Sequence, residues 1–365
     1  MSTNAALQSE LNQRYDTLSA QENLLPIKVT QFFQKKIDEE VSTLGHNEGP
    51  LHRIAYPTRE RLFIRTPDEV DDFVEDRSNM PENAKDSLIH KYHNRILFMV
   101  TNNCIANCQY CFRQNVLSDP LIEKNRLDHK LLVLADYLTL HSEITEVILS
   151  GGDPMSLPYI QLEKIILFLK NISQIEAIRL HTKAISYAPQ VFSEAKMKLL
   201  GDANVRLVFH LVHPYEICDE VGATIKKLQQ YGVRCYNQFP LLRNINDHVE
   251  ILIKLLTLLD DLNVRNLSMY VAEPVKYSAS YRISLPRLFN LLDELNWSTP
   301  SWINSTRFAL DTPIGKVRRE DLQSYNAETG LAIFKRQGKA VRYQDFPQEL
   351  DVSGKLDVLL WRQFD

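Results

Sequence analysis

Short apolar runs alternate with longer amphipathic stretches from Arg95 onward. The stretches at 159–172 and 249–262, among others, have the apolar spacing of amphipathic helices. Six of the short runs are rich in β-branched residues and have strand length, at residues 96–100, 146–150, 177–182, 205–211, 233–239 and 266–272. Strands that alternate with helices predict a parallel sheet with right-handed crossovers. We therefore expect an α/β fold, built as an open, partial (β/α)6 barrel.

The two ends of the chain follow other patterns. The chain up to about Ser87 has a helical and polar pattern, interrupted by loop-forming residues. A strand-like run at 308–316 enters a loop, and 330–345 has the pattern of a small hairpin with Gly338 at its turn. The expected division has a helical extension, the barrel and a C-terminal segment, at residues 1–90, 91–300 and 301–365.

The composition is that of a globular protein with no nucleic-acid or membrane role. Its 365 residues are 44% hydrophobic and 24% charged, ordinary values for a chain with a substantial core. A formal net charge of −4 without a basic tract gives no reason to expect nucleic acid as a partner. No apolar run reaches membrane-spanning length and the N-terminus has no signal pattern, so we expect a cytoplasmic location.

Three of the five cysteines crowd into eight residues, which is a poor disulfide framework and a good metal-ligand cluster. They are Cys104, Cys108 and Cys111, in the spacing CxxxCxxC. A [4Fe–4S] cluster usually takes four thiolates, so three leave one iron open for a substrate. This spacing is typical of radical S-adenosylmethionine (SAM) enzymes, in which SAM chelates that iron. The alternatives are a structural zinc site and an Fe–S protein that only carries electrons or senses redox state, and each needs a fourth ligand.

The sequence SGGDP follows the second predicted strand. Alone, it indicates an ordinary turn. In radical SAM proteins a similar motif holds the amino group of SAM, so Gly151, Gly152 and Asp153 are candidates, with the Asp153 carboxylate available for the ammonium. The cysteines, this motif, Gln238 and Glu273 all follow or end predicted strands, where the active sites of such barrels lie.

Several separated motifs, in order, resemble the lysine 2,3-aminomutase family of radical SAM enzymes. The resemblance runs from about Leu25 to Phe346 and includes PIKVTQFFQKKID, HKYHNRILFMVTNNC, LSGGDP, YNQFPLLRNIND and LDTPIGK. The opening HKY-x-NR is also similar to the group that modifies elongation factor P. The resemblance implies a radical SAM barrel and an isomerase that uses pyridoxal phosphate together with SAM and the cluster.

Carried over residue by residue, the resemblance makes Lys316 the lysine that binds pyridoxal phosphate. It assigns the cofactor's phosphate to Lys91, Arg95 and Gln238, with Lys183 a weaker candidate. Lys91 and Arg95 are spaced i, i+4, so both would face one phosphate if their segment is helical or turned. His213 is either a residue that supports the site or a core histidine.

The same carry-over makes Arg113 the clamp of the substrate carboxylate and places Glu273 and Asp311 at the far end of the substrate. Two converging carboxylates repel unless a cation lies between them, so we expect a cationic amino acid, lysine first and arginine second. The expected reaction moves the α-amino group to the β-carbon, with flavodoxin or ferredoxin as electron donor. Another radical reaction, such as decarboxylation, remains an alternative. The family's C-terminal zinc cysteines are missing, so no zinc is expected, and a homo-oligomer stays an open question.

Overall fold

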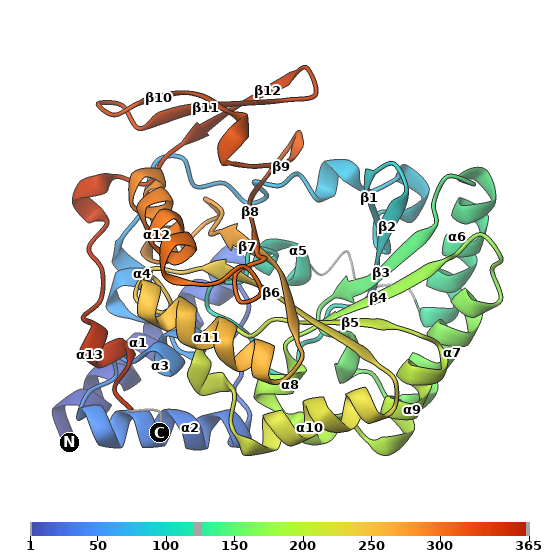
Figure 1. The fold of residues 1–365 in the computed structure, drawn as a ribbon, viewed down its shortest axis with the longest axis horizontal. Helices are drawn as coiled ribbons and strands as arrows, with labels where there is room; N and C mark the ends of the chain where they lie inside the picture. Colours follow the sequence, from blue (N-terminus) through green and yellow to red (C-terminus); the bar gives the residue numbers. More distant parts are fainter. Residues whose placement is uncertain (1, 120–125, 363–365) are drawn as a thin grey trace.

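The computed structural model describes residues 2–119 and 126–362 (Figure 1). Nine strands form one sheet in sequence order and curve into an open barrel. The parallel strands are β2 (Arg95–Thr101), β3 (Glu146–Gly151), β4 (Ala177–Thr182), β5 (Arg206–Phe209), β6 (Arg234–Leu241), β7 (Arg265–Val271) and β8 (Arg307–Thr312). The edges are antiparallel, because β1 (Leu88–Tyr92) pairs with β2 and β9 (Gly315–Val317) pairs with β8.

Long helices follow most of the parallel strands and cover the outer face of the sheet (Figure 1). They are α6 (Leu127–Leu140), α7 (Tyr159–Lys170), α9 (Glu194–Asp202), α10 (Asp219–Gln230), α11 (Val249–Asp261) and α12 (Leu285–Ser298). Alternate strand residues, such as Leu180 and Leu207, pack with helix residues such as Ile165 and Leu228 in one large apolar core. The other residues of each strand therefore face the inside of the barrel.

The N-terminal extension consists of α1 (Ser2–Glu22), α2 (Gln31–Leu44), α3 (Pro50–Ala55) and α4 (Arg59–Phe63). At the other end, β10 (Leu322–Asn326), β11 (Leu331–Arg336) and β12 (Lys339–Gln344) form a separate antiparallel sheet. The chain then returns through the short α13 (Leu356–Leu359), and Trp361 Nε1 donates to Glu40 Oε2 at 3.1 Å, so the two ends of the chain lie together (Figure 1).

The predicted partial barrel is confirmed. All six predicted strands appear as β2 to β7, and the predicted helices at 159–172 and 249–262 appear as α7 and α11. The hairpin appears as β11 and β12, with Gly338 at φ 78° in its turn.

Three features differ from expectation. The run at 308–316 folds as β8 and β9, so the barrel has a seventh parallel strand. Lys91 lies on the edge strand β1, which crosses the expected boundary at residue 90, and the turn of a hairpin separates it from Arg95. A third strand, β10, joins the hairpin. Within the described part of the chain, the helices are too short or too polar for any of them to cross a membrane.

Candidate active site

The three cysteines lie in the loop after β2, at the carboxyl end of the barrel strands. The N-terminal extension holds this loop through its backbone. Lys28 Nζ donates to Cys104 O at 2.6 Å, Asn107 N donates to Lys28 O at 2.9 Å, and Gln109 N donates to Ile54 O at 2.9 Å. The extension is therefore part of the site and fixes where the cysteines lie.

The surroundings of the cysteines fit an iron–sulfur cluster. All three are free, and Cys104 and Cys111 pack against an apolar cluster that contains Met99 and Val116. Burial raises the pKa of Cys111 to about 12 and that of Cys104 well above its usual range, so both hold their protons until a metal replaces them. Within residues 2–119 and 126–362 no three Cys, His, Asp or Glu side chains are placed to hold a single metal ion. The thiols still act on one another electrostatically, as expected for ligands of separate irons in one cluster.

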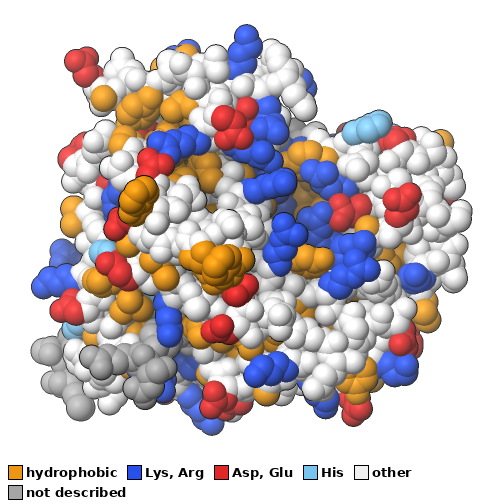
Figure 2. Space-filling model, viewed as in Figure 1, with side chains coloured by type: hydrophobic (Ala, Val, Ile, Leu, Met, Phe, Trp, Pro, Cys, Tyr) orange, Lys and Arg blue, Asp and Glu red, His pale blue; other side chains and the backbone are white. Residues whose placement is uncertain are grey.

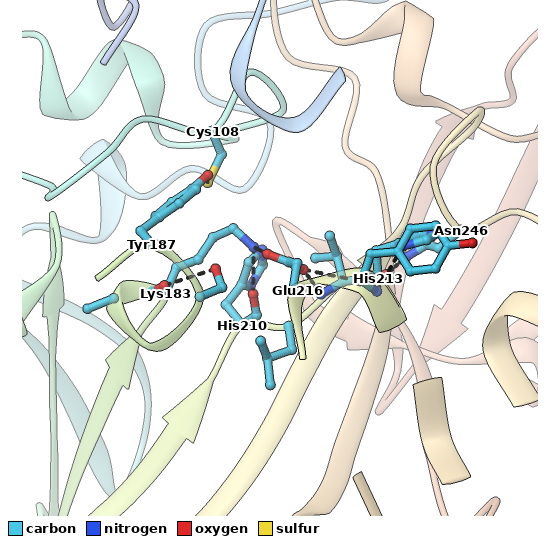
Figure 3. Close-up of polar contacts among 12 residues, drawn as sticks. Cys108, Lys183, Tyr187, His210, His213, Glu216 and Asn246 are labelled. Atoms are coloured by element: carbon cyan, nitrogen blue, oxygen red, sulfur yellow. Dashed lines mark hydrogen bonds and ion pairs between the residues drawn. The ribbon is translucent and has the colours of Figure 1, made fainter. Parts of the chain in front are cut away.

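A buried polar network extends from Cys108 into the protein (Figure 3). Tyr187 Oη lies 3.1 Å from Cys108 Sγ, and the Lys183 ammonium lies 5.3 Å from the centre of the Tyr187 ring. Lys183 follows β4, and Tyr187 ends the short α8 (Ala184–Tyr187). Lys183 forms an ion pair with Glu216, whose side chain is fully buried. One hydrogen-bond donor and one buried ion pair therefore lie behind this cluster ligand.

Glu216 is held in turn by the loop after β5. Its Oε2 accepts from the backbone N of Val212 at 2.6 Å and of His213 at 3.1 Å (Figure 3). His213 Nδ1 accepts from Tyr215 N at 3.2 Å, and the side chain is completely buried. Of the two expectations for His213, the structure therefore supports a core histidine that orders this loop.

The two glycines of the SGGDP motif allow the turn after β3 to pack against the cysteine loop. Gly151 adopts φ 102°, which favours glycine. A Cβ on Gly152 would lie 2.3 Å from Asn103 O, which leaves no room for any other residue. Gly152 N donates to Thr101 O at 2.6 Å and Asp153 N donates to Asn103 O at 2.9 Å. The motif thus aligns β3 with the loop that carries the cysteines.

The Asp153 carboxylate is not available as expected. It accepts from Met155 N at 3.0 Å, from Thr182 Oγ1 at 2.7 Å, and from the backbone N of Lys183 and Ala184, each at 2.9 Å. These bonds fill its acceptor capacity and join β3 to the end of β4. The expectation of a free carboxylate for the SAM ammonium is therefore wrong, because the fold uses this side chain itself.

A chain of polar side chains crosses the inner face of the barrel from Lys316. Lys316 Nζ donates to Tyr270 Oη at 2.7 Å, and Tyr270 Oη donates to Gln238 Oε1 at 3.4 Å. Gln238 Nε2 lies 3.2 Å from His181 Nδ1. His181 Nε2 is buried without a hydrogen-bond partner, and burial holds the pKa of His181 well below its usual value. A lysine at one end of this chain and an unsatisfied buried nitrogen at its other end fit a polar ligand such as pyridoxal phosphate.

Arg113, Glu273 and Asp311 act on one another electrostatically. Arg113 Nε donates to the buried Asp76 Oδ2 at 2.6 Å, which leaves the outer nitrogens of the guanidinium for another acceptor. Burial, and next the repulsion of Asp311, raises the pKa of Glu273 to about 8. Asp311 is paired with Lys91, whose Nζ lies 3.0 Å from Asp311 Oδ1.

The cations expected at the phosphate of pyridoxal phosphate are arranged differently from the prediction. Lys91 and Arg95 lie on the two strands of a hairpin and not on one helical face. Lys91 Nζ donates to Val74 O and Asp311, while the Arg95 guanidinium stacks 4.0 Å from the centre of the Tyr92 ring. Lys183 is engaged by Glu216.

Sequence reasoning missed several residues of the site. Tyr270 and His181 have a usable signal, since each lies on the inward period of its strand near the carboxyl end. Asp76 and Tyr187 have none, because they follow no pattern and reach the site only through tertiary folding.

Several known proteins are similar to this chain in sequence. The model of the radical SAM superfamily matches residues 98–256, which include the cysteines and the SGGDP motif. The chain is 33% identical over 236 residues to the L-lysine 2,3-aminomutase of Haemophilus influenzae, covering 64% of this chain and 66% of that protein. It is 28% identical over 274 residues to the L-lysine 2,3-aminomutase of Escherichia coli K12, covering 74% and 76%. Among solved structures, Streptococcus suis SuiB is similar at a TM-score of 0.46 and 15% identity, over 60% of this chain and 50% of that chain.

Proposed function

Since this chain belongs to the lysine 2,3-aminomutase family of radical SAM isomerases, we propose that it moves the α-amino group of a cationic L-amino acid to the β-carbon. Lysine is the first expected substrate and arginine the second. The reaction is proposed to need pyridoxal phosphate in addition to the [4Fe–4S] cluster and SAM. When bound, the cluster and SAM supply a radical that removes a hydrogen atom, and pyridoxal phosphate supplies the carbonyl carbon that carries the migrating nitrogen.

One observation carries the choice of substrate. Glu273 and Asp311 lie close enough for their charges to oppose each other, and Arg113 interacts electrostatically with both. An α-amino acid with a cationic side chain matches these three side chains, since its carboxylate suits the free side of Arg113 and its distal cation suits the two acids. A neutral or acidic side chain would bring no cation to either acid.

The ion pair between Lys91 and Asp311 would change when substrate binds. Lys91 is the only cation paired with Asp311 among the described residues. A substrate ammonium would take the place of Lys91 at Asp311, and Lys91 would then be released toward the phosphate of pyridoxal phosphate. Both roles that the family resemblance assigns, Asp311 at the substrate and Lys91 at the phosphate, would then be met together in the substrate-bound state.

Lys316 and its neighbours would orient the second cofactor. The Lys316 amine is the group that would bind pyridoxal phosphate covalently, and Tyr270 Oη fixes its direction. Gln238 is held between Tyr270 and His181, so a ligand that meets the lysine also meets the free His181 Nε2. Asp76 would keep Arg113 turned to receive the substrate carboxylate. An external flavodoxin or ferredoxin is the expected electron donor.

A direct test is an anaerobic assay of the cluster-loaded enzyme with SAM, pyridoxal phosphate, a reductant and each common amino acid separately. Mass spectrometry and chiral chromatography of the products should find a β-amino acid from lysine or arginine. Glu273→Gln should raise the KM for that substrate by about tenfold or more, because a charge-assisted hydrogen bond contributes roughly 1.5–3 kcal/mol. A best substrate that is acidic or apolar would refute the substrate class.

A further inference from the structure

The inner face of the barrel carries arginines that the proposed reaction does not use. Each of the strands β5 to β8 begins with an arginine, and β4 has one as its third residue. We call the set the arginine row: Arg179, Arg206, Arg234, Arg265 and Arg307. Figure 2 shows Lys and Arg side chains gathered over the middle of the face where Figure 1 draws strands β4 to β9.

Strand register places three members of the row side by side. Arg206 of β5 pairs with Arg179 of β4 on one side and with Arg234 of β6 on the other. Paired residues of parallel strands point to the same face, and neighbours along a strand point to the opposite one. Leu207 and Cys235, the next residues, lie in the helix-covered core, so the three arginines face the inside of the barrel.

The other two members continue the row. Arg265 of β7 pairs with Tyr236, which lies two residues after Arg234 on the same face. Arg307 of β8 pairs with Ser268, which in turn pairs with Gln238. The row therefore follows the inner face across five adjacent strands: Arg179, Arg206, Arg234 and Arg265 lie nearer the amino ends of the strands than Gln238, and Arg307 lies level with Gln238.

The charges of the row are largely uncompensated. Arg179 is paired with Glu146 at 2.6 Å, and Arg234 Nη2 donates to Asn204 Oδ1 at 2.9 Å. Among the described residues, none forms an ion pair or a side-chain hydrogen bond with Arg206, Arg265 or Arg307. Like charges directly opposite each other on neighbouring strands are destabilising, so an anion bound among them would relieve this repulsion.

We propose that the arginine row binds the phosphate group of a small molecule, with Arg206 at the centre of the site. Guanidinium groups bind phosphate oxygens bidentately, and Arg179 and Arg206 are half-buried, where such bonds are stronger than at an open surface. The guanidiniums of Arg179, Arg206 and Arg234, together with the Glu146 carboxylate, carry a net charge of two positive units. This charge matches that of a phosphate dianion. The inner face of a curved sheet suits a small ligand better than the flat surface of an acidic protein.

The shared chemistry is a phosphate group, and its source is either pyridoxal phosphate itself or another phosphorylated molecule. The test is calorimetric titration of the full-length, cluster-loaded protein with inorganic phosphate at constant ionic strength. Arg206→Gln should weaken phosphate binding by about tenfold or more, since it removes the central bidentate donor. The matched control is Arg342→Gln, which changes an exposed arginine on β12, outside the barrel, and should leave the affinity unchanged.

The unfolding temperature, measured with and without phosphate, distinguishes phosphate binding by Arg206 from a purely structural role of this residue. Without phosphate, Arg206→Gln should unfold at the same temperature as wild type or higher, because it removes repulsion, and phosphate should no longer raise that temperature. Wild type and Arg342→Gln should both be stabilised by phosphate. No phosphate binding by wild type, equal affinity in Arg206→Gln, or binding of acidic proteins alone would overturn the proposal.

Loading the protein with pyridoxal phosphate identifies the source. If the loaded protein no longer binds inorganic phosphate, the row holds the phosphate of this cofactor; if its affinity is unchanged, the row serves another phosphorylated molecule. Both results retain the site. Failure to form a β-amino acid would refute the proposed function and leave the phosphate titration unaffected, so the two failures are distinguishable.

Discussion

Burial governs the chemistry of individual residues in this site. Glu273 is 9% exposed, and burial together with Asp311 raises its pKa to about 8. At neutral pH it is therefore mostly protonated in the free enzyme. A cationic substrate binds best to the ionised form, so binding should be coupled to the loss of this proton.

The pH dependence of kcat/KM tests this coupling. For a group with a raised pKa, the ionised fraction falls about tenfold for each pH unit below that pKa. With lysine or arginine, kcat/KM should rise as the pH approaches about 8 and then level off. Glu273→Gln should have a lower kcat/KM and lack this rise, as measured by anaerobic kinetics across the range. An unchanged rise in the variant would assign the titration to another group.

Tyr187 offers a prediction about the cluster itself. Its hydroxyl lies 3.1 Å from Cys108 Sγ, and hydrogen bonds to cluster sulfurs stabilise the reduced, more negative state. Tyr187→Phe should lower the midpoint potential by about 30–60 mV, a threefold to tenfold shift of a one-electron equilibrium. The measurement is a redox titration followed by electron paramagnetic resonance. Tyr231→Phe, which loses a hydroxyl bonded to Glu194, should leave the potential unchanged. Equal potentials in Tyr187→Phe and wild type would argue against this hydrogen bond.

At the scale of elements, the turn after β3 shows what pattern alone reveals and what it does not. The position of SGGDP, directly after a strand, was predictable from the sequence. The contacts of Asp153 were not, because its partners lie at the end of β4, about thirty residues on. A motif therefore locates a turn reliably, whereas the direction of its carboxylate depends on the neighbouring strand.

The same turn gives a prediction about packing. Gly152→Ala would place a Cβ against the Asn103 carbonyl at 2.3 Å, so the cysteine loop must move. We expect a destabilisation of about 1–3 kcal/mol and a clear loss of bound iron. Gly222→Ala, in α10, is the control, since its Cβ meets only Leu262 at 3.6 Å and should stabilise the helix by about 0.5–1 kcal/mol. Full iron content in Gly152→Ala would contradict this account of the motif.

Strand β9 contains Lys316, the residue that we expect to bind pyridoxal phosphate covalently. Lys316 reaches Tyr270 across the sheet, which fixes its amine inside the barrel. Borohydride treatment of the loaded enzyme should attach the cofactor to Lys316, and peptide mapping should find the label there. Lys316→Ala should take up no borohydride-stable label. A label on a different lysine would show that the assignment of this strand is wrong.

The whole molecule explains why the sequence predicts the barrel better than it predicts the site. Strands and helices have local periodicity, so β2 to β7 could be found from the positions of apolar residues. The site depends on contacts between distant segments. Lys28 and Ile54 of the N-terminal extension hold the cysteine loop, and Asp76 holds Arg113. A hydrophobic pattern contains no record of such contacts, and for this reason the ion pair of Lys91 with Asp311, about 220 residues along the chain, was not predictable.

We propose above that the enzyme moves an amino group within its substrate. The most direct measurement uses L-lysine labelled with ¹⁵N at the α-amino group, incubated anaerobically with the cluster-loaded enzyme, SAM, pyridoxal phosphate and a reductant. Nuclear magnetic resonance of the product then locates the label. The account predicts ¹⁵N bonded to the β-carbon, with the carboxylate retained. Label that stays on the α-carbon, or product that has lost its carboxylate as carbon dioxide, would contradict it.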